Sequence, residues 1–415
     1  MSRKVVVFNL GCKVNQYECD SLIGGLRDKG YTAFSELVAA DVYIINTCAV
    51  TSEAERKSRQ IISRIKHINP DAFIMVSGCA SQANQDYYIK KGIPFVSGVQ
   101  DRDKILDYIG KSTVFDSAIP NEYQDTIYAP TGDRTRAYVK IQDGCDNFCS
   151  YCIIPHLRGR SRSREVQAAK REIELLSQTS GEIVITGINL SKYGKDNNTS
   201  LAALINQIKD TNARIRLGSF YVEGVNKELL DALFSLKNFC PHFHLSLQHG
   251  DNGVLRDMNR HYTADEYLQK AEMIRSYNLN AAITTDIIVG YPTETEEAFV
   301  NTLQFAKRAR FADIHIFPFS KREGTKAAAL PMLSSEIIKD RRERLTAVKD
   351  DLRIDYLNKM LQTPQKVLFE GDSGGLRVGY SEYYIRVYAA TKEKQALVIP
   401  KEIYKDGLKG DVING

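Results

Sequence analysis

The stretch Cys145-Asp-Asn-Phe-Cys149-Ser-Tyr-Cys152 carries three cysteines, separated by three and then by two residues. Three thiolates at this spacing fit around one corner of an iron–sulfur cube, and a cube of four irons then keeps one iron open. An open iron can bind and activate a small molecule, which a closed structural site cannot do. Zinc is the alternative, because His156 could supply the fourth ligand that a structural zinc site needs nearby.

Length and composition indicate a globular protein with a redox or metal function. The 415 residues are enough for two or three domains, and 43% hydrophobic and 26% charged residues are ordinary values. No apolar run reaches the roughly 18 residues of a membrane span, and the first residues lack a signal-peptide pattern, so we expect a cytoplasmic protein without a membrane partner. Eight cysteines in such a chain favour metal or redox chemistry over disulfides. The net charge of +5 permits a nucleic-acid partner without requiring one.

Three β-branched runs in the first third of the chain each end beside a cysteine. The runs are residues 4–10, 41–46 and 72–77, and the cysteines that follow them are Cys12, Cys48 and Cys79. Helical patterns over 15–29 and 52–67 separate the runs, which predicts parallel βαβ units in a Rossmann-like sheet, with 93–98 as a fourth strand. Because ligands bind where the strands of such a sheet end, the three cysteines should converge there and hold a second iron–sulfur cluster. The alternative is that each is an ordinary small buried residue, which is how we interpret Cys19 and Cys240.

A polar linker over 123–136 leads into a second series of βα units. Its expected strands are 136–142, 182–187, 214–219, 242–247, 281–290 and 313–319. Six units are too few to close an eight-stranded barrel, so we expect a partial (β/α)6 barrel of the TIM type. Chemistry on βα barrels takes place at the carboxyl ends of the strands. Residues at those ends are candidates for the wall of a cofactor pocket: Gly187, Asn189, Ser219, Gln248, Gly290 and Pro292.

Histidines and arginines of the central series have competing interpretations. We expect core or supporting roles, rather than metal ligation, for His242, His244, His249 and His261. Four arginines in seven residues, Arg158, Arg160, Arg162 and Arg164, follow the cysteine motif closely. Arginine forks suit phosphate or carboxylate groups, which makes Arg158 and Arg160 candidate substrate contacts, and the alternative is a solvated charged loop.

The chain ends in a long charged helix over 334–361 and a small all-β barrel of about fifty residues. Expected strands of the barrel are 367–371, 379–388, 395–399 and 410–412. Tyrosines surround the basic residue Arg386, with Tyr384 among them, and such a surface can stack on unpaired nucleobases. Tyrosines packed as strand core are an equally good interpretation.

The central motif, with the aromatic Tyr151 between its last two cysteines, resembles the radical S-adenosylmethionine (radical SAM) enzymes. Three N-terminal cysteines, the central motif and a terminal β-barrel, in this order, resemble the radical SAM methylthiotransferases over the whole chain. The resemblance implies three domains: a methylthiotransferase domain at 1–122, a radical SAM domain at 123–362 and a TRAM-like RNA-binding domain at 363–415. Residues 11–18 and 46–51 resemble the branch that modifies threonylcarbamoyladenosine.

The resemblance also implies cofactors, partners and a reaction. Two [4Fe–4S] clusters are expected, an auxiliary one on Cys12, Cys48 and Cys79 and a SAM-binding one on Cys145, Cys149 and Cys152. Tyr151 joins the candidate pocket residues above as a SAM contact. One SAM methylates a sulfur on the auxiliary cluster, and a second gives the deoxyadenosyl radical that removes hydrogen from adenine C2 of a tRNA anticodon loop at position 37. A low-potential electron donor and a sulfur donor are also expected.

Modest departures from the family pattern concern the finer SAM and substrate contacts. The family's Gln-Ser-Gly is here Gln248-His249-Gly250. Its Ser-Ser-(Ile/Leu)-Glu-Pro is Gly-Ser-Phe-Tyr-Val at 218–222, and its Gly-Phe-Pro-Gly is Gly-Tyr-Pro-Thr at 290–293. Rival interpretations are modification of isopentenyladenosine in tRNA or of an aspartate in a ribosomal protein, an RNA-binding protein with structural zinc, and a radical SAM enzyme whose auxiliary cluster only relays electrons.

Overall fold

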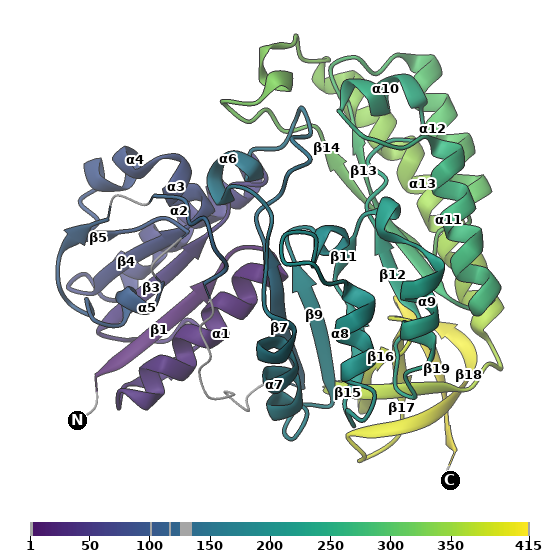
Figure 1. The fold of residues 1–415 in the computed structure, drawn as a ribbon, viewed down its shortest axis with the longest axis horizontal. Coiled ribbons are helices and arrows are strands. Elements are labelled where there is room, and N and C mark those ends of the chain that lie inside the picture. The colour runs from purple at the N-terminus through teal and green to yellow at the C-terminus, as the bar shows by residue number, and fades with distance from the viewer. Residues whose placement is uncertain (1–2, 100–101, 116–117, 125–134, 414–415) are drawn as a thin grey trace.

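The computed structural model describes residues 3–99, 102–115, 118–124 and 135–413. Three units follow one another along these residues (Figure 1): a parallel sheet with helices, a curved central unit of two sheets, and a small barrel at the C-terminal end. Most of the predicted linker lies outside the described residues. The domain boundaries at 122 and 362 therefore stay a proposal.

The N-terminal sheet has six parallel strands in the order β2-β1-β3-β4-β5-β6. Its unit consists of β1 (Lys4–Asn9), α1 (Lys13–Asp28), β2 (Thr32–Phe34), β3 (Val42–Thr47), α2 (Ser52–Ile68), β4 (Phe73–Gly78), α3 (Cys79–Ala83), α4 (Gln85–Lys90), β5 (Phe95–Val96), α5 (Arg102–Ile105) and β6 (Thr113–Val114). Side chains of a strand alternate between faces, so Val5 packs with Leu22 of α1 while Val6 packs with Ile61 of α2. Both faces are thus buried, as the continuous apolar runs predict. The edge strands β2 and β6 were not predicted, because two or three residues show no pattern.

The central unit contains two four-stranded sheets, β10-β9-β7-β8 and β11-β12-β13-β14. Its elements are β7 (Arg136–Asp143), α6 (Ile154–Arg158), β8 (Arg162–Ser163), α7 (Val166–Leu176), β9 (Glu182–Gly187), η1 (Leu190–Lys192), α8 (Leu201–Gln207), β10 (Arg214–Leu217), β11 (Ser219–Phe220), η2 (Val222–Gly224), α9 (Lys227–Phe234), β12 (His242–Leu245), α10 (Asn252–Asp257), α11 (Ala264–Tyr277), β13 (Ala282–Val289), α12 (Glu296–Ala309), β14 (Asp313–Pro318) and η3 (Lys326–Ala329). The six predicted strands are confirmed as β7, β9, β10, β12, β13 and β14, with helices on the outside (Figure 1).

One predicted strand of the central unit is divided. The expected strand 214–219 ends as β10 at Leu217, and the next residues form β11, which pairs with β12 in the second sheet. Gly218 stands at the break, and its N–H donates to the carbonyl of Ile185 at 2.8 Å. The partial barrel is therefore two sheets set edge to edge rather than one continuous ladder.

Helix α13 (Ser335–Met360) connects the central unit to the C-terminal barrel, as the charged pattern predicts. The barrel is closed, in the order β15-β16-β17-β19-β18. Its strands are β15 (Gln365–Ser373), β16 (Leu376–Ser381), β17 (Arg386–Ala389), β18 (Gln395–Tyr404) and β19 (Gly407–Ile413). The single strand predicted over 379–388 was wrong. A turn in which Tyr384 has a φ of +64° separates β16 from β17, and the Ser381 N–H donates to the Ile385 carbonyl at 2.9 Å across it. Within the described residues, no helix combines the length and the apolar character needed to cross a membrane.

The C-terminal barrel covers the amino ends of the central strands (Figure 1). Arg214 and Arg216 of β10 both bind the carboxylate of Glu182, the first residue of β9, at distances of 2.5 and 2.8 Å. The same guanidinium groups donate to the backbone carbonyls of Lys366 and Ser381 in the barrel, at 2.7 and 3.0 Å. The carboxyl ends of the central strands are left facing the N-terminal unit.

Candidate active site

A cavity of about 330 Å³ lies between the carboxyl ends of the N-terminal and central strands. Both cysteine triples reach it, since its lining includes Cys12, Cys48, Cys79, Cys145 and Cys152. The structure thus brings together two motifs that lie in separate sheets and far apart in sequence. Isoleucines and phenylalanines supply much of the remaining wall: Ile154, Ile188, Ile288, Phe317 and Phe319.

The first triple sits at three neighbouring strand ends. Cys12 precedes α1, Cys48 follows β3, and Cys79 begins α3 directly after β4. Gly78 makes the last of these turns possible, because it has a φ of +102° and a Cβ there would lie 2.3 Å from the Asn46 amide oxygen. The convergence expected from the sequence is therefore present in the fold.

An arginine from the central unit reaches the first triple. The Nε of Arg158, which is fully buried, donates to Cys79 Sγ at 3.3 Å, and its Nη1 donates to Glu18 at 2.9 Å and to Asp143 at 3.1 Å. Burial raises the pKa of the Cys79 thiol, and the Arg158 charge opposes that rise. Burial also raises the pKa of Cys48 to about 12. Such thiols become thiolates when a metal coordinates them, so their environment suits ligands better than free nucleophiles.

The second triple lies on the loop after β7. Gly144 opens this loop with a φ of +70°, and a Cβ there would meet the Arg160 carbonyl oxygen at 1.9 Å. Two sulfurs receive hydrogen bonds from other loops of the central unit. Arg260, between α10 and α11, donates to Cys149 at 3.5 Å, and Asn189, after β9, donates to Cys145 at 3.6 Å. Donors to sulfur stabilise thiolate charge and orient the ligands of a cluster.

Sulfur spacing distinguishes a cluster from zinc. Three thiolates on one Zn²⁺, each about 2.3 Å from the metal, lie no more than roughly 4.6 Å apart. Within the described residues, His244, Asp286 and His315 bring three possible ligand atoms within 4.8 Å of one another, and neither cysteine triple does. His156 is exposed and packs edge-on against the Phe148 ring. Neither triple therefore holds its sulfurs as close together as the ligands of one zinc ion would lie, which does not support the zinc alternative.

The predicted SAM contacts divide into two groups. Tyr151, Gly187, Ser219 and Gln248 line the cavity. Asn189, Gly290 and Pro292 are outside that lining. Asn189 instead contacts Cys145, and a Cβ on Gly290 would lie 2.5 Å from Ile338 of α13, so this glycine permits close helix packing. Binding of SAM by these seven residues stays a prediction.

The arginine run is buried apart from one member. Arg158, Arg162 and Arg164 are buried, so the solvated-loop alternative was wrong for them. Arg160 keeps 74% of its side chain exposed, pairs with Asp146 and lies over the Phe148 ring. Contact of Arg158 and Arg160 with substrate stays a prediction, although the structure gives Arg158 a cysteine partner.

The C-terminal candidates have partners within the chain. Tyr384 stacks on His242 with ring centroids 4.8 Å apart and lies under the guanidinium of Arg216. Arg386 pairs with the exposed Asp406 at 2.7 Å. Their contact with RNA stays a prediction.

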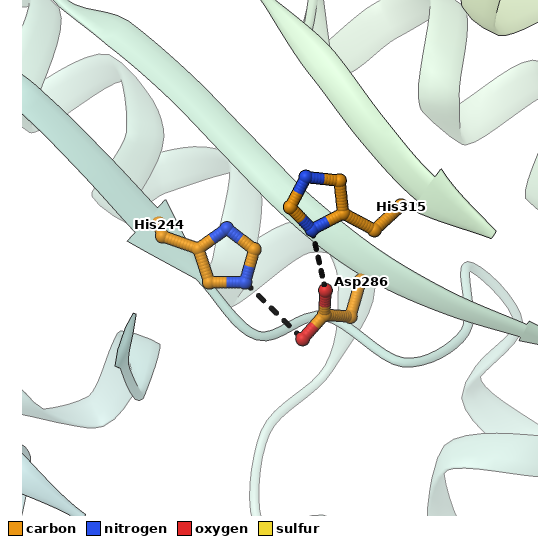
Figure 2. Close-up of side chains that lie close together, drawn as sticks. All are labelled: His244, Asp286 and His315. Atoms are coloured by element: carbon orange, nitrogen blue, oxygen red, sulfur yellow. Dashed lines mark hydrogen bonds and ion pairs between the residues drawn. The ribbon is translucent and has the colours of Figure 1, made fainter. Parts of the chain in front are cut away.

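A polar triad on β12, β13 and β14 was not predicted as a unit. Figure 2 shows Asp286 between two imidazoles, with His244 Nε2 at 3.1 Å and His315 Nδ1 at 3.2 Å from its two oxygens. The hydrogen bond with Asp286 raises the pKa of His315. Although burial opposes it, hydrogen bonding to both histidines holds the pKa of Asp286 below its usual value. Asp286 also lines the cavity. The three residues come from separate strands, so only a known register could have joined them.

Arg260 and Tyr221 were also missed by the sequence analysis. Tyr221 lines the cavity, and the Arg260 guanidinium lies 4.3 Å from its ring centroid while donating to Cys149. Neither residue belongs to a recognisable motif: Tyr221 follows the two-residue strand β11, and Arg260 lies between α10 and α11.

Comparison with known proteins agrees with this geometry. Residues 139–306 match the Radical SAM superfamily, and residues 4–98 match Uncharacterized protein family UPF0004. Threonylcarbamoyladenosine tRNA methylthiotransferase MtaB of Thermotoga maritima is 38% identical over 92% of this chain and 91% of its own length. The protein of the same name from Bacillus subtilis is 35% identical, with 97% and 94% covered. This chain belongs to the radical SAM methylthiotransferases.

The chain is also similar to a relative named for another substrate and to a solved structure. The tRNA-2-methylthio-N(6)-dimethylallyladenosine synthase of Thermodesulfovibrio yellowstonii is 33% identical over 99% of both chains. The solved structure of the radical S-adenosylmethionine methyltransferase TsrM from Kitasatospora setae superposes with a TM-score of 0.56 over 79% of this chain and 77% of its own, at 14% identity. That likeness concerns the fold alone. As a radical SAM methylthiotransferase, the enzyme uses SAM and [4Fe–4S] clusters.

Proposed function

We propose that this enzyme methylthiolates C2 of N6-threonylcarbamoyladenosine at position 37 of tRNA, giving 2-methylthio-N6-threonylcarbamoyladenosine. The observation that carries the proposal is the single cavity shared by both cysteine triples. Insertion of a sulfur group at a C–H bond requires hydrogen removal and sulfur delivery at the same carbon, and one cavity can hold that carbon for both. The MtaB proteins of Thermotoga maritima and Bacillus subtilis carry the name of this activity.

The chain's own residues prepare the cavity for this reaction. When bound, the clusters and SAM supply sulfur, a methyl group and radical hydrogen abstraction. Arg158, Asn189 and Arg260 donate hydrogen bonds to the sulfurs of Cys79, Cys145 and Cys149. The apolar wall around Ile288 and Phe319 excludes water, which protects reactive species from side reactions. No carboxylate pair for acid–base catalysis is needed, because hydrogen leaves as an atom.

The proposal includes roles for the three units and for the partners. The N-terminal unit holds the auxiliary cluster, the central unit holds the SAM cluster, and the C-terminal barrel contributes Tyr384 and Arg386 to RNA contact. The target base must leave the stack of the tRNA anticodon loop to enter a cavity of this size. A low-potential electron donor and a sulfur donor complete the reaction, which we place in the cytoplasm.

A second candidate substrate is N6-dimethylallyladenosine in tRNA, favoured by the 33% identical Thermodesulfovibrio yellowstonii synthase. Mass spectrometry of tRNA nucleosides distinguishes the two substrates. The gene is expressed in a bacterial host from which the host's own tRNA methylthiotransferases have been deleted. Gain of the methylthio-threonylcarbamoyl product supports the proposal, gain of the dimethylallyl product supports the alternative, and an unchanged tRNA profile contradicts both.

A further inference from the structure

The cavity opens to solvent beside the start of α2. Val50 and Phe317 line the cavity and keep 50% and 40% of their surface exposed, so they mark its mouth. Thr51, the N-cap of α2, belongs to the same lining. Ser320, in the loop after β14, also lines the cavity and accepts a hydrogen bond from the Ser52 N–H at 3.1 Å. Helix α2 therefore starts at the mouth, and its 17 residues, at about 1.5 Å each, extend roughly 25 Å from it.

The exposed face of α2 is strongly cationic. From residue 56 to its end the helix contains no acidic residue, and it exposes five cations, which we call the α2 surface: Arg56, Lys57, Arg59, Arg64 and Lys66. The two acids of α2 lie in its first turn, where Glu53 pairs with Arg56 at 2.6 Å and Glu55 pairs with Arg322 of the central unit at 2.8 Å. Arg59, Arg64 and Lys66 form no ion pair with the part of the chain that the structure describes. Much of this positive charge is therefore available to an external anion.

This charge distribution is unusual for a helix that only faces water. Solvated helices commonly mix charges of both signs, because opposite charges three or four residues apart stabilise a helix and like charges destabilise it. Helix α13 has that mixture, with seven cations and six acids, and pairs such as Arg344 with Asp340 at 2.9 Å. On α2, by contrast, Arg56 and Arg59 stand three residues apart with the same sign. The excess of cations on α2 indicates a surface for a polyanion.

The cationic region continues onto α4. The guanidinium of Arg59 and the ammonium of Lys91, the C-cap of α4, both lie over the Tyr87 ring, 5.8 and 6.0 Å from its centroid. Lys90 is exposed beside Lys91, and Asp86 at the start of α4 offsets one of these charges. Cations combined with an accessible aromatic ring are typical of surfaces that bind single-stranded nucleic acid.

We propose that the α2 surface binds the sugar–phosphate backbone of the tRNA anticodon arm and thereby holds the target base at the cavity. A base that has left its stack keeps a phosphate on either side, so cations beside the mouth lie close to those phosphates. The C-terminal barrel covers the opposite ends of the central strands (Figure 1), so α2 lies closer to the mouth than the barrel does. The inference rests on the proposed function, since it assumes a tRNA substrate.

The experiment removes two cations from each of two helices. The double variant Arg59→Gln, Arg64→Gln changes the α2 surface, and Lys339→Gln, Arg342→Gln is the matched control, because both of its residues are exposed on α13. Glutamine forms helices well, and iron content checks that each variant folds and assembles its clusters. Full-length, cluster-loaded enzyme is titrated with a fluorescently labelled anticodon stem-loop RNA carrying N6-threonylcarbamoyladenosine, at several KCl concentrations. A third variant, Arg59→Lys, Arg64→Lys, keeps the charge.

Two lost phosphate contacts should weaken RNA binding by roughly 30-fold at about 0.1 M KCl and reduce the slope of log Kd against log salt by about 1.5. The lysine variant and the α13 control should bind as the wild type does. In the glutamine variant, KM for the RNA should rise while kcat is retained, because Arg59 and Arg64 lie outside the cavity lining. Equal salt slopes in the wild type and the glutamine variant would show that α2 does not bind phosphate.

Two other outcomes point to different partners. If the glutamine variant binds RNA normally but loses activity only when a protein electron donor replaces dithionite, the α2 surface receives an acidic protein and the inference is wrong. A wild type that neither binds nor methylthiolates the RNA contradicts the proposed function itself, before any variant is considered.

Discussion

Arg158 and Cys79 lie 79 residues apart in the sequence, yet the Nε of Arg158 donates to the Cys79 Sγ at 3.3 Å. The guanidinium group joins the two halves of the active site, because Arg158 ends α6, which follows the second cysteine motif, while Cys79 belongs to the first. Glu18 and Asp143 hold the same guanidinium from both units. Movement of one cluster site relative to the other is thereby restricted.

Replacing Arg158 by Lys should impair the auxiliary cluster selectively. Lysine keeps the charge and loses the fork that reaches Cys79, Glu18 and Asp143 together. Loss of a donor to a ligand typically costs about 10- to 100-fold in metal affinity or activity. Iron in the purified protein should therefore fall from about eight toward about four atoms per chain, while SAM cleavage without RNA persists.

Arg160→Lys is the matched control for this variant. Arg160 comes from the same run, is 74% exposed and pairs only with the surface residue Asp146 among the described residues. Iron content should stay at the wild-type value, and only activity on tRNA can change if Arg160 contacts the substrate. Equal iron loss in both variants would show that the hydrogen bond to Cys79 has no special importance.

Single replacements should separate the roles of the two cysteine triples. Cys79→Ala is expected to keep SAM cleavage to 5′-deoxyadenosine but to lose the methylthio product, whereas Cys149→Ala should lose both. Cys19→Ala should retain both activities, because Cys19 is on the buried face of α1 and packs in the apolar core. Chromatography measures both products, 5′-deoxyadenosine and the methylthio nucleoside. Continued methylthiolation by Cys79→Ala would rule out the first triple as the sulfur-delivering site.

The sequence predicted the parts of the site that depend on local position. Each of Cys12, Cys48 and Cys79 follows an apolar run, and parallel strands bring such positions to one edge whatever the rest of the chain does. The contact of Arg158 with Cys79 could not be predicted, because it depends on how two separately folded sheets meet.

The turn at Tyr384 and the histidine–aspartate triad could not be predicted either, because both depend on tertiary structure. The strand expected over 379–388 contains no proline or asparagine at the turn, so only the tertiary structure places Tyr384 at positive φ. The triad of His244, Asp286 and His315 depends on the register of three strands, and no sequence spacing encodes it.

Titration of His315 tests the triad. Its pKa is raised by the hydrogen bond to Asp286, so the stability contributed by this pair is fully present below the ordinary histidine value of 6.5 and is lost as the pH rises through the higher folded value.

In Asp286→Asn, the pKa of His315 should fall back to 6.5 or lower. Histidine NMR titration measures both proteins. His242 should stay neutral throughout, because burial lowers its pKa well below 6.5. An unchanged His315 titration in the variant would contradict the triad.

Replacing Glu182 by Gln should detach the C-terminal barrel from the central unit. Burial alone would raise the pKa of this carboxyl, but Arg216, Arg214 and Arg136 together lower it to about 2. Its stabilising contribution is therefore present above the ordinary pKa of 4.5 and is lost as the pH falls toward 2. At neutral pH the variant leaves the three guanidinium groups without their carboxylate, which typically costs 3–5 kcal/mol. Urea unfolding should show this loss of unfolding free energy.

Glu370→Gln is the control, because Glu370 is a partly exposed carboxylate that binds only Arg136 of the three arginines. This variant should cost about 1 kcal/mol or less. Similar losses in the two variants would mean that surface pairing, rather than the buried network, holds the barrel in place.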